Sequence, residues 1–270
     1  MLKVCLPLEF DRGVLETLYE RYNRREYIHP DPLEFLYRYE SIADREIVGI
    51  VAASLAYGRV NQILKSVSLV LDRMGPSPFQ YIQKNSLENF QRSFKDFKHR
   101  FTTGDQLSGF LKGIKGIVEL YGSLQSCFLS GLRESDSTVL PALTAFVKEL
   151  NACADCNMSM FLPSPGKGSA CKRLNLFLRW MVRCDDVDPG GWRGVSPSRL
   201  IVPLDTHMHR IGRMLGLISR KQADMRAALE LTDKFKTIFP SDPVRYDFAL
   251  TRLGIRNDLS LALAVSGSHD

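Results

Sequence analysis

Helix signals recur along most of this chain, whereas a strand pattern is nearly absent. The Asp-Pro pair at residues 31–32 is typical of a helix N-terminus, because an Asp side chain caps free backbone N–H groups and proline fits the first helical position. Apolar residues at helical spacing fill residues 44–58, 63–75, 107–122 and 138–150, and the first three of these segments end at glycine. The sequence therefore predicts an all-α fold.

Size and composition describe an ordinary folded chain. Its 270 residues, 44% hydrophobic and 24% charged, suit one large domain or two small ones that share a cleft. No run reaches the roughly 18 apolar residues of a membrane helix, and the first residues lack the apolar core of a signal peptide. Six scattered cysteines are too few for a disulfide framework. We therefore expect a cytoplasmic protein with reduced thiols and no membrane association.

The excess of positive charge is confined to the last part of the chain. Residues 1–156 hold 19 Lys and Arg against 19 Asp and Glu, whereas residues 157–270 hold 17 against 11. Within that part, residues 167–220 carry ten basic and four acidic side chains. This density suits a polyanion such as nucleic acid, although a solvated basic surface is the more common explanation of charge alone.

A candidate nucleophile lies at the start of a predicted helix. Ser169 is expected to cap this helix, and the apolar residues between Leu174 and Val182 form a single stripe. Lys172 lies opposite that stripe in the first turn, where the positive end of the helix dipole and nearby arginines disfavour a further cation. These arginines are Arg173, Arg179 and Arg183. A lysine whose protonated form is disfavoured can form a Schiff base with a carbon such as C1′ of an abasic sugar, although most lysines on a polar helix face are simply solvated.

A second candidate residue, Asp205, is expected to be the N-cap of a helix in residues 200–217. An N-cap Asp commonly stabilises a helix by about 1 kcal/mol without any catalytic role, so a catalytic role requires the carboxylate also to face an electron-poor centre in a cleft. His207 and His209 lie on nearly opposite faces of this helix, and we therefore expect no metal site. Residues 184–203, rich in glycine and proline, predict an ordered loop at the rim of a binding site.

The segments LPSPGKGSACKRLN, residues 162–175, and PLDTHMHRIGRMLGL, residues 203–217, together resemble the helix-hairpin-helix DNA glycosylase superfamily. In that superfamily a hairpin leads into a helix whose early lysine forms the Schiff base in bifunctional members, and a later D-T-H segment carries the catalytic aspartate. The resemblance implies these roles for Lys172 and Asp205. Their separation of 33 positions is similar to that in the archaeal 8-oxoguanine glycosylases, which implies an oxidised purine such as 8-oxoguanine as the substrate.

The resemblance also implies an architecture and a partner. Two helical subdomains are expected to flank a cleft: residues 44–200 with a helix-hairpin-helix-like element, and residues 1–43 together with 201–270. The partner is double-stranded DNA, bound by a monomer that flips a damaged base out of the duplex. No group of four closely spaced cysteines follows Asp205, so the iron–sulfur cluster of endonuclease III is not expected, and no cofactor is predicted.

Further residues receive roles from the same resemblance. The predicted DNA contacts are Arg59, Asn61, Gly166, Lys167, Gly168, Arg173, Arg179, Arg183, His207, Arg210 and Arg213. Among them, Arg59 and Asn61 are expected in a loop that fills the gap left by the flipped base, and Gly166 and Gly168 offer backbone amides to a phosphate. The aromatic residues that could stack on that base are Trp180, Trp192, Tyr246 and Phe248.

Two alternatives remain open at this point. In a monofunctional glycosylase, Lys172 only contacts a phosphate and Asp205 assists an attacking water. In a helical DNA-binding module without chemistry, neither residue reacts. Covalent trapping that depends on Lys172 distinguishes the first hypothesis from both alternatives.

Overall fold

The computed structural model describes residues 12–154 and 161–255. Helices dominate this part of the chain, and two short strands within it pair as an antiparallel hairpin, so the predicted all-α fold is confirmed. In chain order the elements are α1 (Arg12–Tyr22), η1 (Arg25–Tyr27), η2 (Pro32–Arg38), α2 (Ile42–Leu55), α3 (Val60–Met74), α4 (Pro78–Lys84), α5 (Leu87–Phe94), β1 (Lys98–His99), β2 (Thr102–Thr103), α6 (Gly104–Tyr121), α7 (Leu124–Ser130), α8 (Leu140–Ala154), η3 (Pro165–Lys167), α9 (Lys172–Val182), η4 (Pro197–Arg199), α10 (Thr206–Met214), α11 (Met225–Ile238) and α12 (Asp247–Ile255), where η denotes a 3₁₀ helix.

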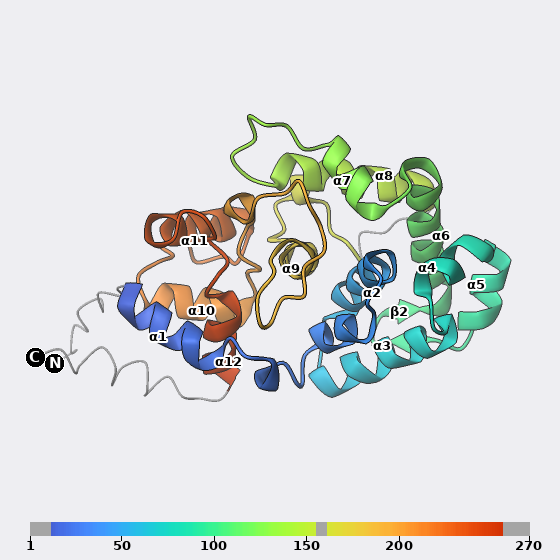
Figure 1. Ribbon diagram of the computed structural model, residues 1–270, viewed down its shortest axis with the longest axis horizontal. Coiled ribbons are helices and arrows are strands. Elements are labelled where there is room, and N and C mark those ends of the chain that lie inside the picture. Colours follow the sequence, from blue (N-terminus) through green and yellow to red (C-terminus); the bar gives the residue numbers. More distant parts are fainter. Residues whose placement is uncertain (1–11, 155–160, 256–270) are drawn as a thin grey trace, which may run out of the picture.

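The helices form two groups with α9 between them (Figure 1). On one side lie α2 to α8, where α6 packs against α5 and α8. On the other side lie α1, α10, α11 and α12, where α12 packs against both α1 and α10. Residues 1–43 and 201–270 were predicted to form this second group, of which residues 1–11 and 256–270 lie outside the described part of the chain. Within the described part, η2 does not belong to the second group, because it packs on α2 and α3 and its Leu33, Phe35 and Leu36 are buried.

The apolar stripe predicted on α9 is buried, and it holds the helix that begins with Lys172 against α2. Leu174, Phe177 and Met181 are all buried. A methyl group built on Gly49 of α2 would lie 3.3 Å from the Phe177 ring, so the glycine permits close approach of the two helices. Burial of each such side chain contributes about 1.5–3 kcal/mol. The first turn of α9 therefore belongs to a firmly packed helix.

A similar close approach joins α6 to α8. A methyl group on Gly113 of α6 would lie 2.9 Å from the backbone oxygen of Leu150, and one on Gly116 would lie 2.6 Å from Cys153 Cβ. Such distances are too short for a real Cβ atom. The two glycines therefore set the separation of these helices.

The N-terminus of α2 differs from its prediction. Ser41 Oγ accepts a hydrogen bond from the backbone N–H of Asp44 at 3.4 Å and is the N-cap, so α2 begins earlier than the expected Asp44. The Asp44 carboxylate instead accepts hydrogen bonds from Ser77 Oγ at 2.7 Å and from the N–H of Phe79 at 2.9 Å. Asp44 thus links α2 to the start of α4.

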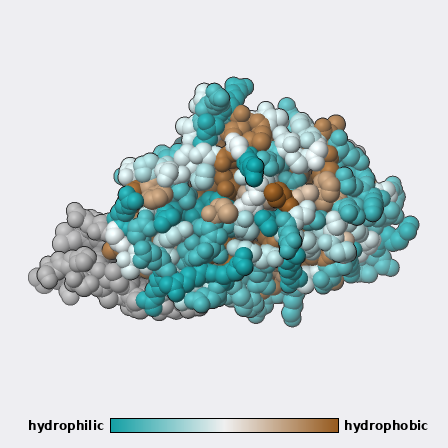
Figure 2. All heavy atoms as spheres, in the orientation of Figure 1, coloured by the Kyte–Doolittle hydropathy of each residue, from teal (hydrophilic) through white to brown (hydrophobic). Residues whose placement is uncertain are grey.

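The surface drawn in Figure 2 is mostly hydrophilic, and its hydrophobic residues form small separated areas. Such areas are normal on a folded protein, because apolar atoms contribute much of any protein surface. Within residues 12–154 and 161–255, none of the helices combines the length and apolar character that crossing a membrane requires.

Candidate active site

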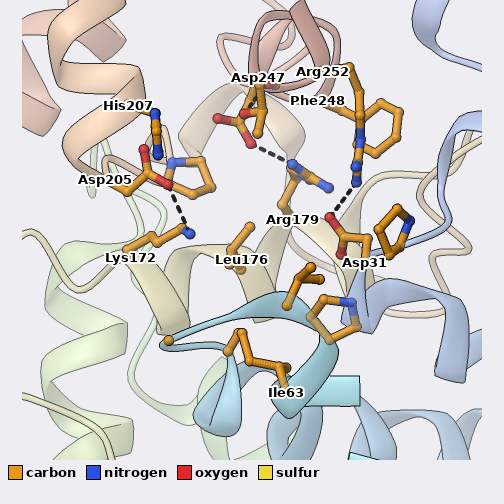
Figure 3. Close-up of a pocket in the computed structure, with 17 residues that line it drawn as sticks. Asp31, Ile63, Lys172, Leu176, Arg179, Asp205, His207, Asp247, Phe248 and Arg252 are labelled. Carbon is orange, nitrogen blue, oxygen red and sulfur yellow. Dashed lines mark hydrogen bonds and ion pairs between the residues drawn. The ribbon is translucent and has the colours of Figure 1, made fainter. Parts of the chain in front are cut away.

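The fold brings the two motif residues into direct contact. Lys172 is the first residue of α9, and Asp205 is the N-cap of α10. Lys172 Nζ lies 3.0 Å from Asp205 Oδ2, and both side chains are partly exposed, at 35% and 24% (Figure 3). Two residues 33 positions apart in the chain therefore form an ion pair that solvent reaches.

The Asp205 carboxylate caps α10 and also contacts a cation. Its Oδ1 accepts a hydrogen bond from the N–H of Met208 at 2.8 Å, as predicted for an N-cap, and its Oδ2 contacts Lys172. Burial alone would raise the pKa of Asp205, but the Lys172 ammonium and the Met208 N–H outweigh it, so the pKa lies below its ordinary value. The carboxylate is therefore the stable form at neutral pH.

The surroundings of Lys172 differ from the prediction in two ways. The cap of α9 is Cys171, in a left-handed conformation with φ of 48°, whereas Ser169 Oγ accepts the Cys171 N–H at 3.3 Å. Arg173 does not lie beside the amine: its guanidinium covers the Tyr57 ring at 5.2 Å and donates to the backbone oxygen of Ser54 at 2.8 Å. The charged group that faces Nζ at 3.0 Å is a carboxylate, not an arginine.

Two of the arginines predicted to contact DNA are buried, so that prediction is wrong. Arg179 and Arg183 are each 3% exposed and paired with aspartates inside the protein, so neither lies on the outer surface where a DNA backbone would run. Arg179 donates to Asp188 Oδ1 at 3.1 Å and to Asp247. The acceptors of Arg183 are Asp185, Asp188 and Asp242. A buried guanidinium needs such carboxylates, because an unpaired charge is unstable away from water.

A cavity of about 350 Å³ adjoins the Lys172–Asp205 pair (Figure 3). One part of its wall is apolar and includes Val60, Ile63 and Leu176. Another part carries charge: Arg179 is paired there with Asp247, and Arg252 Nη2 lies 2.6 Å from Asp31 Oδ2. The remaining lining residues are Pro30, Pro32, Ala56, Gly58, Pro203, His207, Phe248 and Thr251. We refer to this space as the Lys172 cavity.

The charged part of the wall was not identified from the sequence. Asp31 was assigned only as a cap, and it does accept the N–H of Leu33 at 3.0 Å as expected, but its other oxygen binds Arg252. Burial raises the pKa of Asp247 to about 6, against the opposing effect of Arg179. Residues 247, 248, 251 and 252 have helical spacing and lie on one face of α12. This spacing is the sequence signal from which that part of the cavity wall could have been predicted.

Of the aromatic residues predicted to stack on a base, Phe248 alone borders the Lys172 cavity. Arg252 lies over its ring at 4.6 Å. Trp180 is fully buried, Trp192 is buried and donates its Nε1–H to Glu46 Oε2 at 3.1 Å, and Tyr246 is buried and donates to Glu16 Oε1 at 2.7 Å. The predictions for these three residues are wrong, because each belongs to the core.

The remaining predicted DNA contacts are at the surface. Arg59, Asn61, Gly166, Lys167, Gly168, His207, Arg210 and Arg213 are all exposed. The predicted hairpin contains η3 and ends at Gly168, whose φ of 81° is left-handed. A second cavity, of about 410 Å³, lies along this hairpin and shares Lys172 and Asp205 with the first. The ion pair thus borders two cavities.

No group of three or more His, Cys, Asp or Glu side chains in the described part of the chain is arranged to hold a metal ion. The polar groups that line the Lys172 cavity are an amine, carboxylates, guanidiniums, the His207 imidazole and the Thr251 hydroxyl. This set can transfer protons, supply an amine nucleophile and donate hydrogen bonds to a polar ligand.

Comparison with known proteins connects the chain to a family. Residues 31–256 match a family model described as "Protein of unknown function (DUF2400)". The match covers most of the chain and includes every residue that lines the Lys172 cavity except Pro30. No curated protein and no solved structure matches the chain.

Proposed function

Because the chain belongs to the DUF2400 family, whose function is unknown, we propose a function from the site itself. The protein is a DNA glycosylase with AP-lyase activity, in which Lys172 is the Schiff-base nucleophile and Asp205 assists it. The observation that carries this proposal is the 3.0 Å contact between Lys172 Nζ and Asp205 Oδ2 at the edge of a cavity large enough for a base. The motif resemblance of both segments supports the same roles.

The geometry supports a stepwise reaction. Asp205 accepts a proton from Nζ, and the neutral amine forms a bond with C1′ of the damaged nucleotide. The N-glycosidic bond breaks, its electron pair leaves with the base, and the base takes up a proton. The base takes this proton from the –NH2+– group formed at Nζ. The Nζ electron pair then opens the sugar ring, Asp205 returns its proton to the ring oxygen O4′, and a protonated imine joins Lys172 to C1′. Removal of a C2′ proton then breaks the 3′ C–O bond, which is the lyase step.

The Lys172 cavity supports the binding of an extruded base. Its volume of about 350 Å³ exceeds that of a purine, its apolar wall suits the faces of a ring, and its charged groups suit the polar edge of a ring. The Phe248 ring lies in the same wall. The size and lining of the cavity favour an oxidised purine such as 8-oxoguanine as the substrate. The Lys172-to-Asp205 spacing, which is similar to that of archaeal 8-oxoguanine glycosylases, favours the same substrate.

The surrounding surface supports a DNA partner. Within the two motif segments, Lys167, Arg210 and Arg213 are exposed cations that suit phosphate contacts. The hairpin is exposed at Gly166 and Gly168, but the Gly168 N–H donates to the backbone oxygen of Pro165 at 3.1 Å, so this amide does not serve a phosphate as predicted. We therefore propose double-stranded DNA as the partner and a monomer that acts in the cytoplasm.

One observation favours a second candidate, a monofunctional glycosylase. In the structure the amine of Lys172 is engaged by a carboxylate, an arrangement that also suits a lysine that only contacts a phosphate. Asp205 would then assist a water molecule that attacks C1′. The two candidates differ in whether a covalent intermediate forms.

The test is borohydride trapping on a duplex that contains an abasic site, followed by a duplex that contains 8-oxoguanine. We expect wild type to form a covalent complex, Lys172→Ala to form none, and Asp205→Asn to release the base about 10²–10⁴-fold more slowly. Lys148→Ala is the matched control, because this lysine is exposed on α8 and lines neither cavity, and it should retain trapping. Base release without a covalent complex identifies the monofunctional enzyme, and the absence of both reactions rejects the proposal.

A further inference from the structure

The β1–β2 hairpin presents an aromatic side chain to solvent beside the candidate site. Its turn consists of Arg100 and Phe101, and Phe101 is 67% exposed. Arg100 has a φ of 53°, a left-handed conformation that non-glycine residues rarely adopt. An exposed phenylalanine in a strained turn is unfavourable for folding alone, so this turn is a candidate for a binding role.

Buried polar contacts hold the base of the turn in place. His99 and Thr102, which flank the turn, are both buried. His99 Nδ1 lies 2.9 Å from Ser66 Oγ, and its Nε2 lies 3.1 Å from the backbone oxygen of Tyr57. The Tyr57 hydroxyl lies 2.6 Å from Thr102 Oγ1 and donates to the backbone oxygen of His99 at 2.9 Å. The exposed ring of Phe101 therefore rises from a rigid support.

The same contacts place the turn next to the Lys172 cavity. A methyl group built on Gly58 would lie 2.7 Å from Arg100 Cδ, so Arg100 packs directly on Gly58. Gly58 lines the Lys172 cavity, and Tyr57 lines the second cavity that shares Lys172 and Asp205. The hairpin therefore contacts Tyr57 and Gly58, two residues that line the cavities bordered by Lys172 and Asp205.

The charge around the turn fits a polyanion. Lys98 and Arg100 in the hairpin and Arg59 in the adjacent segment are exposed cations. The guanidinium of Arg100 lies 5.4 Å from the centre of the Phe101 ring. An exposed aromatic ring with a cation beside it is the combination that binds bases by stacking and the neighbouring phosphates by charge.

We propose that Phe101, rather than the loop of Arg59 and Asn61 expected from the resemblance, enters duplex DNA at the nucleotide being extruded and stacks on a base that has lost its partner. Arg59, Lys98 and Arg100 then contact the flanking phosphates. This inference rests on the proposed function, since it assumes a duplex whose damaged nucleotide occupies the Lys172 cavity. Removing a base from the stack leaves a gap, and an aromatic side chain that fills the gap offsets the lost stacking. Phe101 is thus proposed as an interface residue that no motif in the sequence indicated.

The test compares equilibrium binding of three DNA probes: a duplex with a tetrahydrofuran analogue of an abasic site, the same duplex without the lesion, and the lesion strand alone. Phe101→Ala should weaken binding to the lesion duplex about 5–150-fold, the range expected for one lost base–aromatic stack, and should have a smaller effect on the other two probes. Phe101→Trp should restore binding. Leu120→Ala is the matched control, because Leu120 is 70% exposed on α6 and lines neither cavity.

The outcomes separate this proposal from the proposed function. Borohydride trapping on a single-stranded abasic oligonucleotide should be unchanged in Phe101→Ala, because Lys172 chemistry does not need a duplex gap. If wild type is trapped but Phe101→Ala binds the lesion duplex as tightly as wild type, only the role of Phe101 is overturned. An equal loss of affinity for all three probes overturns it as well. Wild-type protein that binds none of the probes and is not trapped rejects both proposals.

Discussion

Replacing Arg179 with methionine should destabilise the protein, because it leaves a buried carboxylate without its cation. Arg179 and Asp247 are both buried and form an ion pair in the wall of the Lys172 cavity. Asp188, the other partner of Arg179, keeps its contact with Arg183 in the variant, so Asp247 is the group that loses its cation. Methionine fills much of the arginine volume, so the loss of charge is the main change.

The expected magnitude follows from the burial of the pair. Breaking a buried ion pair by removal of one partner costs about 3–5 kcal/mol, whereas an exposed pair contributes about 0–1 kcal/mol. For a chain of this size the former corresponds to a decrease in Tm of roughly 6–20 °C. Glu119→Gln, which removes the i,i+4 pair between Lys115 and a 60% exposed Glu119, is the control and should change the free energy of unfolding by less than about 1 kcal/mol.

The pH dependence of the effect provides the sharpest test. Burial already raises the pKa of Asp247 to about 6, and removal of Arg179 raises it further, so acidification neutralises this carboxyl while the protein is folded. A raised folded-state pKa means that the folded state binds more protons than the unfolded state. The difference in free energy of unfolding between Arg179→Met and wild type should therefore shrink as the pH decreases. Urea denaturation between pH 5 and 8 measures this, and Arg179→Met with Asp247→Asn should recover most of the loss. A deficit that does not change with pH, or no recovery in the double variant, would refute the reasoning.

Two further predictions concern packing and the ion pair at the site. Gly113→Ala should lower the free energy of unfolding by about 1–3 kcal/mol, because its Cβ would lie 2.9 Å from the Leu150 backbone oxygen. Gly166→Ala is the control: its Cβ would meet only Ser164 Oγ, at 3.8 Å, so its free energy of unfolding should stay within about 0.5 kcal/mol of wild type. Equal effects of the two variants in thermal unfolding would contradict this account. The folded-state pKa of Asp205 is lowered, so its contribution to stability should be constant above about pH 5 and be lost as the pH falls below its ordinary value of 3.8. Denaturation of wild type and Asp205→Asn across this pH range measures that contribution as the difference between their free energies of unfolding. A difference that grows on acidification would mean that the pKa of Asp205 is raised in the folded state, contrary to this account.

The sequence predicted most of the local interactions, although the caps of α2 and α9 are Ser41 and Cys171 rather than the expected Asp44 and Ser169. The helical segments, the apolar stripe of α9, the N-cap role of Asp205 and the cap at Asp31 depend on residues within about four positions of one another, and the structure contains all of them. The two motif residues, Lys172 and Asp205, were also identified beforehand, from a resemblance of short segments. Their 3.0 Å contact is what the fold adds.

Only the tertiary structure decided which charged and aromatic residues reach the site. Arg179 and Arg183 continue the polar side of a helix and look solvent-facing in the sequence, but their carboxylate partners come from Asp188, Asp242 and Asp247. Asp247 lies 68 positions from Arg179, and no local pattern encodes that pairing. The same reason explains why Phe248, although buried, lines the Lys172 cavity while Trp192 and Tyr246 do not. Local interactions determine where helices and caps form, whereas the burial of a side chain depends on which distant segments pack together. The charged wall of the cavity forms through such long-range packing, so the local sequence does not reveal it.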